Sequence, residues 1–405
     1  MATGTDSFRR SFNALEKRFE ALQPEAELTV HDSELAVEGH VVVWSTQNAI
    51  NGPLGRCGKG GTRISPSLTL DEVRMLARTQ SLKNAAAGLP LGGAKSGLRG
   101  DPASPDFEAR YKRFVRLVSP MLRQNGGLWG GFGFDIGARP IHCQWACEEL
   151  GRLDAFTGKP LEQGGTNYDE EGIAGLGVAI AAATLLENKL KGVAGARIAI
   201  QGLGAMGAAV CRYASELGMH VHAIADPRID GCWVGEQPVT DNLLRAIAAM
   251  DFDTTNQLLP HSGFSKHPLP FILTQPVDVL IPCAVQNVIH ADNTELLQSW
   301  AVVEGANNPT TPEGRELLHQ KGIHLIPDII ANPGGAIAAF VELTSKVTNE
   351  DNLKHGTKCT EAKEITRQRV SENVNNVLEL AEREICSPTT AAHYLAYERI
   401  FGTSS

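Results

Sequence analysis

The stretch ARIAIQGLGAMG, residues 196–207, decides the fold. It begins as a short apolar run typical of a buried strand and continues through glycines into a helix predicted from about Ala205 to Leu217. The next predicted strand is HVHAIAD, residues 220–226. A strand, a glycine turn, a helix and a second strand are typical of the βαβ unit of a parallel sheet.

The glycines of this turn, Gly202, Gly204 and Gly207, have the spacing G-x-G-x-x-G. The first glycine makes the turn, the second lets the backbone approach a pyrophosphate, and the third allows the helix to pack on the strand. Unpaired N–H groups at the helix start stabilise phosphates. A lone turn of this kind is a weak signal, but the strands on either side of it favour a dinucleotide site over a plain tight turn.

Asp226 ends the second strand, 24 residues beyond Gly202. An acidic residue at this place is expected to bind the adenosine ribose, which favours NAD. Arg228 follows two residues later and can instead meet a 2′-phosphate. The sequence therefore predicts NAD as the cofactor and leaves NADP possible.

Three later apolar runs, which alternate with predicted helices, extend the sheet. They are VDVLIPC (277–283), WAVVEGA (300–306) and IHLIPDI (323–329). Strands that alternate with helices predict a doubly wound parallel sheet. We therefore predict a two-domain α/β protein in which residues 166–369 form a Rossmann-type NAD(P)-binding domain. Residues 1–165, joined by C-terminal helices at about 370–405, are expected to form a substrate-binding and oligomerisation domain.

Bulk composition narrows the class of protein. The chain has 405 residues, of which 42% are apolar, and its net charge of −9 argues against nucleic acid or an anionic membrane as the main partner. No apolar run is long enough for a membrane span, and no secretory signal is evident. The eight cysteines predict reduced thiols in a cytoplasmic protein. Cys143 and Cys147 have helical spacing but no second ligand pair, so no metal site is expected.

Three lysines lie close together in the first domain: Lys59, Lys83 and Lys95. Their neighbours are mostly glycine and alanine, which let a ligand approach the backbone closely. We interpret the cluster as the floor of an anion pocket. Because burial lowers the pKa of a lysine, one of these residues is a candidate base near neutral pH. Together with the glycine turn, this pattern indicates a redox enzyme that acts on a small carboxylate.

Longer motifs connect these features in a fixed order. They are GKGGTRISP, LPLGGAKSGLRGDP, VAGARIAIQGLGAMG, DVLIPCAVQNVI, VVEGANNPTTPEG and PDIIANPGGA. In content and order they resemble the Glu/Leu/Phe/Val (amino-acid) dehydrogenase family over most of the chain. The resemblance implies a reversible, NAD(P)-dependent oxidative deamination of an L-amino acid to its 2-oxo acid and ammonia. It also implies a homo-oligomer, with a hexamer favoured.

The resemblance assigns roles in the first domain to four residues of this chain. Lys95, in the GGAK motif, matches the family's catalytic lysine, and Asp135 matches its proton-transfer partner. Lys59 is similar to the lysine that meets the side-chain carboxylate of glutamate, and Lys83 resembles the residue that holds the α-carboxylate.

Two asparagines in the second half of the chain also match the family. Asn332 matches its substrate-contacting asparagine, and Asn307 resembles the residue that lines the nicotinamide-ribose site.

The chain also departs from the family at three places: the stretch LGRCG before Lys59 is longer than is usual in the family, and two further departures bear on the substrate and on activity. Glutamate enzymes carry a serine where this chain has Ala339, although Lys59 is retained. A retained lysine outweighs a missing hydroxyl, so glutamate is the favoured substrate and another amino acid is the alternative. The segment 164–175 also diverges, which leaves open a catalytically weak paralogue that binds cofactor or amino acid as a sensor or an oligomer partner.

Overall fold

The computed structural model describes residues 5–190 and 192–402, and the chain divides into two compact units. The first, here called the dinucleotide unit, contains the described residues as far as Arg10, together with Asp169–Gly335 and Lys363–Ala392. The second, here called the lysine unit, contains Ser11–Tyr168, Ala336–Ala362 and the described residues from His393 onward.

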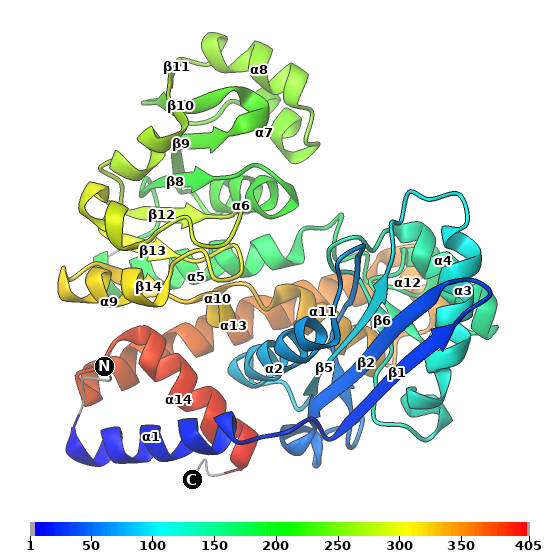
Figure 1. Ribbon diagram of the computed structural model, residues 1–405. Helices are drawn as coiled ribbons and strands as arrows, with labels where there is room; N and C mark the ends of the chain where they lie inside the picture. Colours follow the sequence, from blue (N-terminus) through cyan, green and yellow to red (C-terminus); the bar gives the residue numbers. More distant parts are fainter. Residues whose placement is uncertain (1–4, 191, 403–405) are drawn as a thin grey trace. The chain divides into compact units, whose positions relative to one another are not determined.

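A seven-stranded sheet forms the centre of the dinucleotide unit, in the order β11-β10-β9-β8-β12-β13-β14 (Figure 1). The strands are β8 (Arg197–Gln201), β9 (His220–Asp226), β10 (Gly231–Gly235), β11 (Phe264–His267), β12 (Val279–Pro282), β13 (Ala301–Val303) and β14 (His324–Ile326). Strands β8, β9, β12, β13 and β14 pair in parallel. The predicted Rossmann-type architecture is therefore confirmed.

Two strands of this sheet, β10 and β11, are antiparallel and were not predicted. Only a short 3₁₀ turn, Pro227–Ile229, and Asp230 separate β9 from β10. A parallel return needs a crossover of a dozen or more residues, so the chain can only fold back beside β9 in the opposite direction. The sheet is consequently mixed at this edge.

Helices precede, connect or follow the strands of the dinucleotide unit. They are α5 (Ile173–Leu190), α6 (Ala205–Glu216), α7 (Asp241–Ala248), α8 (Phe252–His261), α9 (Pro312–Gln320) and α10 (Asp328–Ala331). The helix predicted from about Ala205 to Leu217 is found within a residue of its expected bounds, as α6. Helix α6 ends before Gly218, whose φ of 85° suits a glycine stop. Helix α9 begins at Thr311, whose side chain accepts a hydrogen bond from Gly314 N.

The lysine unit contains a five-stranded sheet with helices on both faces (Figure 1). Its strands are β1 (Ala26–Asp32), β2 (Val37–Ser45), β3 (Gly58–Lys59), β4 (Thr62–Ser65) and β5 (Gly92–Arg99). Helix α2 (Leu70–Ala86) covers one face, and α3 (Phe107–Val118) with α4 (Pro140–Leu150) covers the other. Helix α3 can lie close to strand β2 because Gly39 lacks a side chain: a Cβ there would lie 2.4 Å from the Phe114 ring. Smaller elements of the lysine unit are β6 (Phe132–Gly133), β7 (Phe156–Thr157) and α12 (Asn349–His355).

The C-terminal segment follows the expected division only from His393 onward, since that division placed residues 370–405 in the first domain. Helices α13 (Thr357–Glu384) and α14 (Pro388–Phe401) form this segment, and Lys363–Ala392 clusters with the dinucleotide unit. Side chains on α13 bond to α5, with Thr184 Oγ1 at 3.2 Å from Ser371 Oγ. The helical pattern predicts that such a segment has a buried face but does not reveal which element covers it.

The segment before α13 also differs from expectation, because residues 336–362 were assigned to the Rossmann domain. They cluster instead with the lysine unit. Asn352 Nδ2 donates to Gly165 O at 2.8 Å, and Lys358 Nζ donates to Gly164 O at 2.9 Å. Helix α11 (Gly334–Thr344) carries the chain into this segment.

Among the described residues, no helix is long and apolar enough to cross a membrane. All eight cysteines are free thiols and are buried.

Candidate functional site

Lys95 and Asp135 are in direct contact in the lysine unit. Lys95 lies on β5, only 7% exposed, and its Nζ is 2.6 Å from Asp135 Oδ2. Asp135 lies in the glycine-rich loop after β6. This loop lies close against the chain at Gly61, where a Cβ would be 2.3 Å from Phe134 O. The structure therefore brings together the two residues that were predicted to move protons.

Arg63 is a second cation at Asp135, and sequence reasoning did not assign it a role. Its Nε donates to Asp135 Oδ2 at 3.2 Å, and its Nη2 donates to Oδ1 at 3.3 Å. Burial alone would raise the pKa of Asp135, but the charges of Lys95 and Arg63 outweigh it and lower this pKa to about 2. Asp135 is therefore an anion at neutral pH.

Lys59 is deeply buried, 3% exposed, and its ammonium faces the backbone. Its Nζ donates to the carbonyl oxygens of Gly60 at 3.2 Å, Gly131 at 2.9 Å and Phe132 at 2.5 Å. A lysine ammonium has three donors, and all three are used here. Burial lowers the pKa of Lys59 to about 7, although the nearby Glu342 opposes this change. The predicted contact of Lys59 with a substrate carboxylate would have to compete with these carbonyls.

A buried ion pair, Lys159 with Glu342, lies in the same unit and was missed by sequence reasoning. Glu342 on α11 also accepts hydrogen bonds from Gly158 N, Thr166 N and Thr166 Oγ1, each at 3.0 Å. Glu342 acts electrostatically on Lys59, so the pair belongs to the surroundings of the lysine cluster. The only signal in the sequence was Lys159 within FTGKP, residues 156–160, which also resembles the family. Ala339 is buried one helical turn before Glu342.

Lys83 lies near the end of α2, half-buried. The adjacent Asn84 ties this end of the helix to the sheet, because its Nδ2 donates to Lys59 O at 3.2 Å and to Gly92 O at 2.8 Å. The four predicted residues of the first domain therefore belong to one unit, on α2, β3, β5 and the loop after β6.

The glycine turn of the dinucleotide unit fits a bound pyrophosphate. Gly202 has a φ of 92°, and a Cβ there would lie 2.6 Å from the Ala284 Cβ. A Cβ at Gly207 would lie 1.8 Å from Gly202 O, so both positions need glycine for internal reasons. At Gly204 the nearest atom to an added Cβ is Arg228 Nη2, at 3.7 Å. Gly204 precedes the first turn of α6 and leaves open space of the kind that a phosphate needs there.

Asp226 does not present free oxygens to a ribose. It accepts hydrogen bonds from Leu203 N at 2.7 Å and, on both oxygens, from the Arg228 side chain at 2.8 Å. Burial opposes ionisation of Asp226, but these hydrogen bonds outweigh it and lower its pKa. Arg228 is half-exposed and its guanidinium lies 4.1 Å from the Phe252 ring centre. The pair thus presents a fixed guanidinium beside the glycine turn.

Asn332 and Asn307 also meet within the dinucleotide unit. Asn332 Nδ2 donates to Gly305 O at 2.9 Å and to Asn307 Oδ1 at 3.2 Å. Asn332 Oδ1 is buried and has no hydrogen-bond partner within residues 5–190 and 192–402. A buried acceptor without a partner is costly, which makes it a candidate for a ligand N–H.

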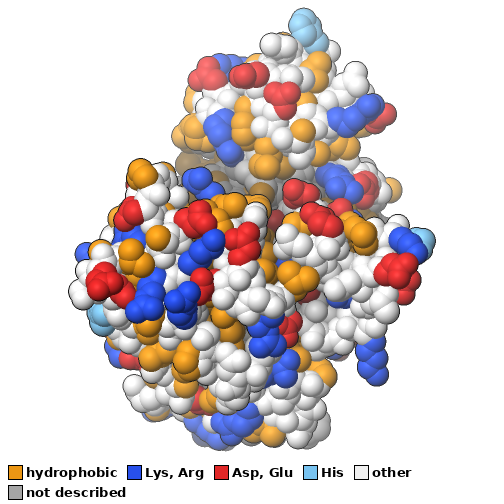
Figure 2. Space-filling view, turned by 90° about the vertical axis from the view of Figure 1, so that its right-hand side faces the viewer, with side chains coloured by type: hydrophobic (Ala, Val, Ile, Leu, Met, Phe, Trp, Pro, Cys, Tyr) orange, Lys and Arg blue, Asp and Glu red, His pale blue; other side chains and the backbone are white. Residues whose placement is uncertain are grey.

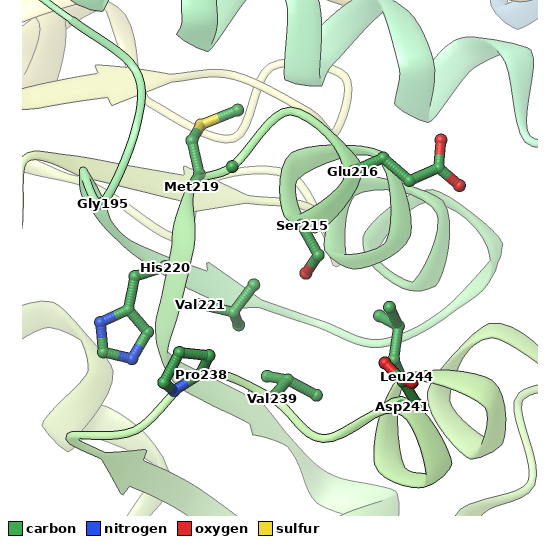
Figure 3. Close-up of a pocket in the computed structure, with 11 residues that line it drawn as sticks. Gly195, Ser215, Glu216, Met219, His220, Val221, Pro238, Val239, Asp241 and Leu244 are labelled. Carbon is green, nitrogen blue, oxygen red and sulfur yellow. The ribbon is translucent and has the colours of Figure 1, made fainter.

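A separate surface depression of about 510 Å³ lies at the amino end of β9 in the dinucleotide unit (Figure 3). Its walls include His220, Val221 and Pro238, with the acidic Glu216 and Asp241 (Figure 3). The described residues that line it include no lysine or arginine. It therefore does not suit a phosphate and is distinct from the glycine turn, which lies at the carboxyl end of the strands.

The lysines of the candidate site are not part of a charged surface. Figure 2 shows acidic and basic side chains interspersed on one face of the molecule, whereas Lys59 and Lys95 are buried. Among the described residues, no three His, Cys, Asp or Glu side chains are grouped to hold a metal ion.

Comparison with known proteins extends these observations. Residues 24–149 match the Glu/Leu/Phe/Val dehydrogenase dimerisation domain, and residues 164–404 match the Glutamate/Leucine/Phenylalanine/Valine dehydrogenase domain. An NADP-specific glutamate dehydrogenase of Saccharolobus shibatae is 31% identical over 372 residues, which covers 88% of this chain and 83% of the relative. An NADP(+)-dependent glutamate dehydrogenase of Pyrobaculum calidifontis is 33% identical over 294 residues, covering 70% of this chain and 68% of the relative.

A solved structure also matches nearly the whole chain. The hetero-hexameric glutamate dehydrogenase from Thermus thermophilus, in its leucine-bound form, has a TM-score of 0.75 and 25% identity, and the match covers 99% of this chain and 97% of that one. The family model alone spans more than half of the residues, in agreement with the motifs in the sequence. The chain belongs to the glutamate, leucine, phenylalanine and valine dehydrogenase family.

Proposed function

We propose that this protein catalyses the reversible, NAD(P)-dependent oxidative deamination of an L-amino acid, with glutamate as the favoured substrate. The observation that carries the proposal is the buried contact of Lys95 with Asp135, at 2.6 Å, within a cluster of lysines. Relatives that are 31% and 33% identical are glutamate dehydrogenases, which supports glutamate.

The reaction requires a hydride acceptor and groups that exchange protons. When bound, the nicotinamide supplies the hydride acceptor, and the substrate Cα–H and N–H bonds break to leave an imine. Water then adds to the imine carbon, the C–N bond breaks, and ammonia leaves to give the 2-oxo acid. Each of these steps moves a proton, and Lys95 and Asp135 are the proposed pair that takes up and returns it. Asp135 is available as an acceptor because its neighbours hold it as the anion, and its low pKa favours the return of any proton that it takes up.

Substrate and cofactor contacts follow from the remaining predicted residues. Lys83 is the proposed partner of the α-carboxylate, and Asn332, whose Oδ1 is unpartnered among the described residues, is the proposed acceptor for a substrate N–H. Asn307, bonded to Asn332, is the proposed contact to the nicotinamide ribose. Gly202, Gly204 and Gly207 are proposed to hold the pyrophosphate.

The Arg228–Asp226 pair favours NADP over NAD. Asp226 has both oxygens occupied, so it is a poor acceptor for a ribose 2′-hydroxyl. Arg228 is half-exposed beside the glycine turn and is suited to a 2′-phosphate. The names of the two relatives, NADP-specific and NADP(+)-dependent, support this choice.

A second candidate substrate is an amino acid with a non-acidic side chain. Two observations favour it: the Lys59 ammonium uses all three donors on backbone carbonyls, and Ala339 offers no hydroxyl. A substrate carboxylate would need Lys59 to exchange at least one carbonyl for it. Such an exchange is feasible for a flexible side chain but reduces the net gain of the contact.

Assembly and location remain proposals as well. The match to a dimerisation domain supports a homo-oligomer, and a hexameric relative supports six subunits. Eight free, buried thiols support a reducing compartment such as the cytoplasm.

A panel of L-amino acids, each assayed with NAD and with NADP by reduced-cofactor absorbance, tests the function. We expect the highest kcat/KM with glutamate and NADP. Turnover of leucine or phenylalanine in preference to glutamate would select the second candidate. Cofactor binding without any turnover would replace both with the non-catalytic alternative.

A further inference from the structure

Arg63 lies between two carboxylates of the lysine unit. Its Nε and Nη2 donate to the two oxygens of Asp135, and its Nη1 donates to Glu72 Oε1 at 2.9 Å. The guanidinium therefore contacts both oxygens of the Asp135 carboxylate. Its remaining nitrogen, Nη1, is held by Glu72 on α2. Arg63 and Asp135 are each 17% exposed, so the contact is largely shielded from water.

Arg63 constrains the orientation of the Asp135 carboxylate, which a lysine ammonium does not. The 2.6 Å ion-pair contact joins Lys95 Nζ to Oδ2 of Asp135, and an ammonium is a point charge that leaves the carboxylate free to turn about its Cβ–Cγ bond. Arg63 is the residue that reaches Oδ1 as well. A planar fork that meets both oxygens sets the plane of the carboxylate as well as its charge.

The fold supplies this arrangement from neighbouring strands. Arg63 lies on β4, which pairs in parallel with β5, and its register partner is Gly97, two residues beyond Lys95. The charged groups that act on Asp135 are Lys95 from β5 and Arg63 from β4, and Glu72 from α2 bonds to the guanidinium. Two cations from adjacent strands thus converge on one carboxylate.

We propose that Arg63 is a positioning residue: it fixes the plane of the Asp135 carboxylate and holds it as the anion, so that Asp135 begins each turnover as a proton acceptor beside Lys95. The kinetic consequence of this inference rests on the proposed function. Its electrostatic consequence belongs to the folded protein alone and can be measured without turnover.

The electrostatic test uses thermal unfolding from pH 2 to pH 7. The pKa of Asp135 is about 2 in the folded protein, below its ordinary value of 3.8, so the stability that this carboxylate contributes is complete above about pH 5 and is lost as the pH falls toward 2. In the wild-type background, the Tm relative to Asp135→Asn is therefore expected to fall between about pH 5 and pH 2. In an Arg63→Met background, the folded pKa moves up toward 3.8, because a neighbouring arginine lowers an aspartate pKa by about one to three units, so the same difference in Tm should vary much less with pH. An equal pH dependence in both backgrounds would overturn the proposal.

The kinetic test compares pH profiles of kcat/KM. Arg63→Met is expected to lower kcat about 10- to 100-fold and to move the acid limb upward by about one unit or more. Arg63→Lys keeps a charge but loses the fork, so it should restore the acid limb while kcat stays low. Arg74→Met is the matched control, because Arg74 makes the same two-point contact to Glu27 away from Asp135.

The outcomes separate the two proposals. If the wild-type protein oxidises no amino acid, the proposed function fails, and the Tm comparison alone decides the role of Arg63. If the wild type turns over and Arg63→Met keeps its kcat and acid limb, Arg63 is not a positioning residue. Should Arg63→Met not fold, the Arg63→Lys profile decides, because an unchanged kcat there contradicts the need for a fork.

Discussion

The candidate site of the dinucleotide unit is formed mostly by backbone, whereas that of the lysine unit is formed by side chains. In the dinucleotide unit the phosphate site is mostly backbone: a glycine turn and the start of α6, within Gly202–Gly207. In the lysine unit the site is made of side chains, and Arg63 and Asp135 come from segments 72 residues apart. A backbone site is encoded locally, whereas a side-chain site exists only once distant elements have packed. The following predictions test this contrast, beginning with the largest expected effect.

Removing the Lys95 ammonium should have the largest effect. Lys95→Ala is expected to lower kcat about 10²- to 10⁴-fold, because it removes a proposed proton-transfer group. Steady-state kinetics with the best amino acid of the panel will measure this. Nucleotide affinity, measured by fluorescence titration, is the control and should change little. A variant that keeps most of its activity would remove Lys95 from the proposed mechanism.

Breaking the buried pair should destabilise the lysine unit strongly. Lys159→Met leaves Glu342 as a buried charge without its cation and is expected to reduce the free energy of unfolding by about 3–5 kcal/mol. Urea denaturation followed by circular dichroism will measure the loss. The matched control in the dinucleotide unit is Lys189→Met, because its partner Glu382 is 65% exposed and such pairs contribute about 0–1 kcal/mol. Equal losses in the two variants would contradict the assigned importance of burial.

Removing the Arg228 guanidinium should change cofactor preference. Arg228→Ala is expected to raise the KM for NADP about 10- to 100-fold with less effect on NAD, because a charge-assisted hydrogen bond contributes about 1.5–3 kcal/mol. The ratio of kcat/KM values for the two cofactors is the measurement. An unchanged ratio would mean that Arg228 serves only to hold Asp226.

Adding a single methyl group at Gly204 tests whether the phosphate binds against the backbone of the glycine turn. Gly204 has room for a Cβ and a φ of −67°, so Gly204→Ala should fold normally. The methyl would occupy space proposed for a phosphate, and cofactor KM should rise about tenfold or less. Gly207→Ala is the contrast, because its Cβ would clash with Gly202 O and should lower Tm. Normal cofactor binding by Gly204→Ala would argue against the proposed phosphate position.

The last prediction concerns the pH dependence of stability at Lys59. Its pKa is lowered by burial to about 7, below its ordinary value of 10.5, so above pH 7 the unfolded chain binds the extra proton. Stability from this group therefore rises between pH 7 and about 10.5 and is constant below that window. Comparison of Tm for the wild type and Lys59→Met at pH 7 and pH 9.5 isolates the effect. The Tm of the wild type relative to that of Lys59→Met should rise from pH 7 to pH 9.5. A constant difference would contradict a lowered pKa.

The sequence predicted the backbone site of the dinucleotide unit more fully than the side-chain site of the lysine unit. The βαβ unit at Gly202 was predicted because its signals are local: a glycine spacing between two short apolar runs. The small residues around Lys95 marked it as one of three candidate lysines, whereas its catalytic role and its pairing with Asp135 came from the family resemblance. No local pattern indicates that two residues 40 positions apart will lie 2.6 Å from each other.

Other features were beyond the sequence pattern. The roles of Arg63 and Glu342 depend on contacts with residues far along the chain, and the assignment of Lys363–Ala392 to the dinucleotide unit depends on which element covers α13. The sequence predicted that Asp226 would bind the ribose. It did not show that the Arg228 side chain would donate to both carboxylate oxygens. Such pairings depend on side-chain directions, which only the folded backbone sets.

Amino-acid order by itself determined the alternation of strands and helices, the phosphate turn and the membership of a dehydrogenase family, because each is expressed in short, contiguous spacing. Tertiary structure alone decided which distant charges meet: Arg63 with Asp135, and Lys159 with Glu342. The physical reason is that an ion pair in a shielded site is governed by distance and burial, and both arise only when separate elements pack against one another.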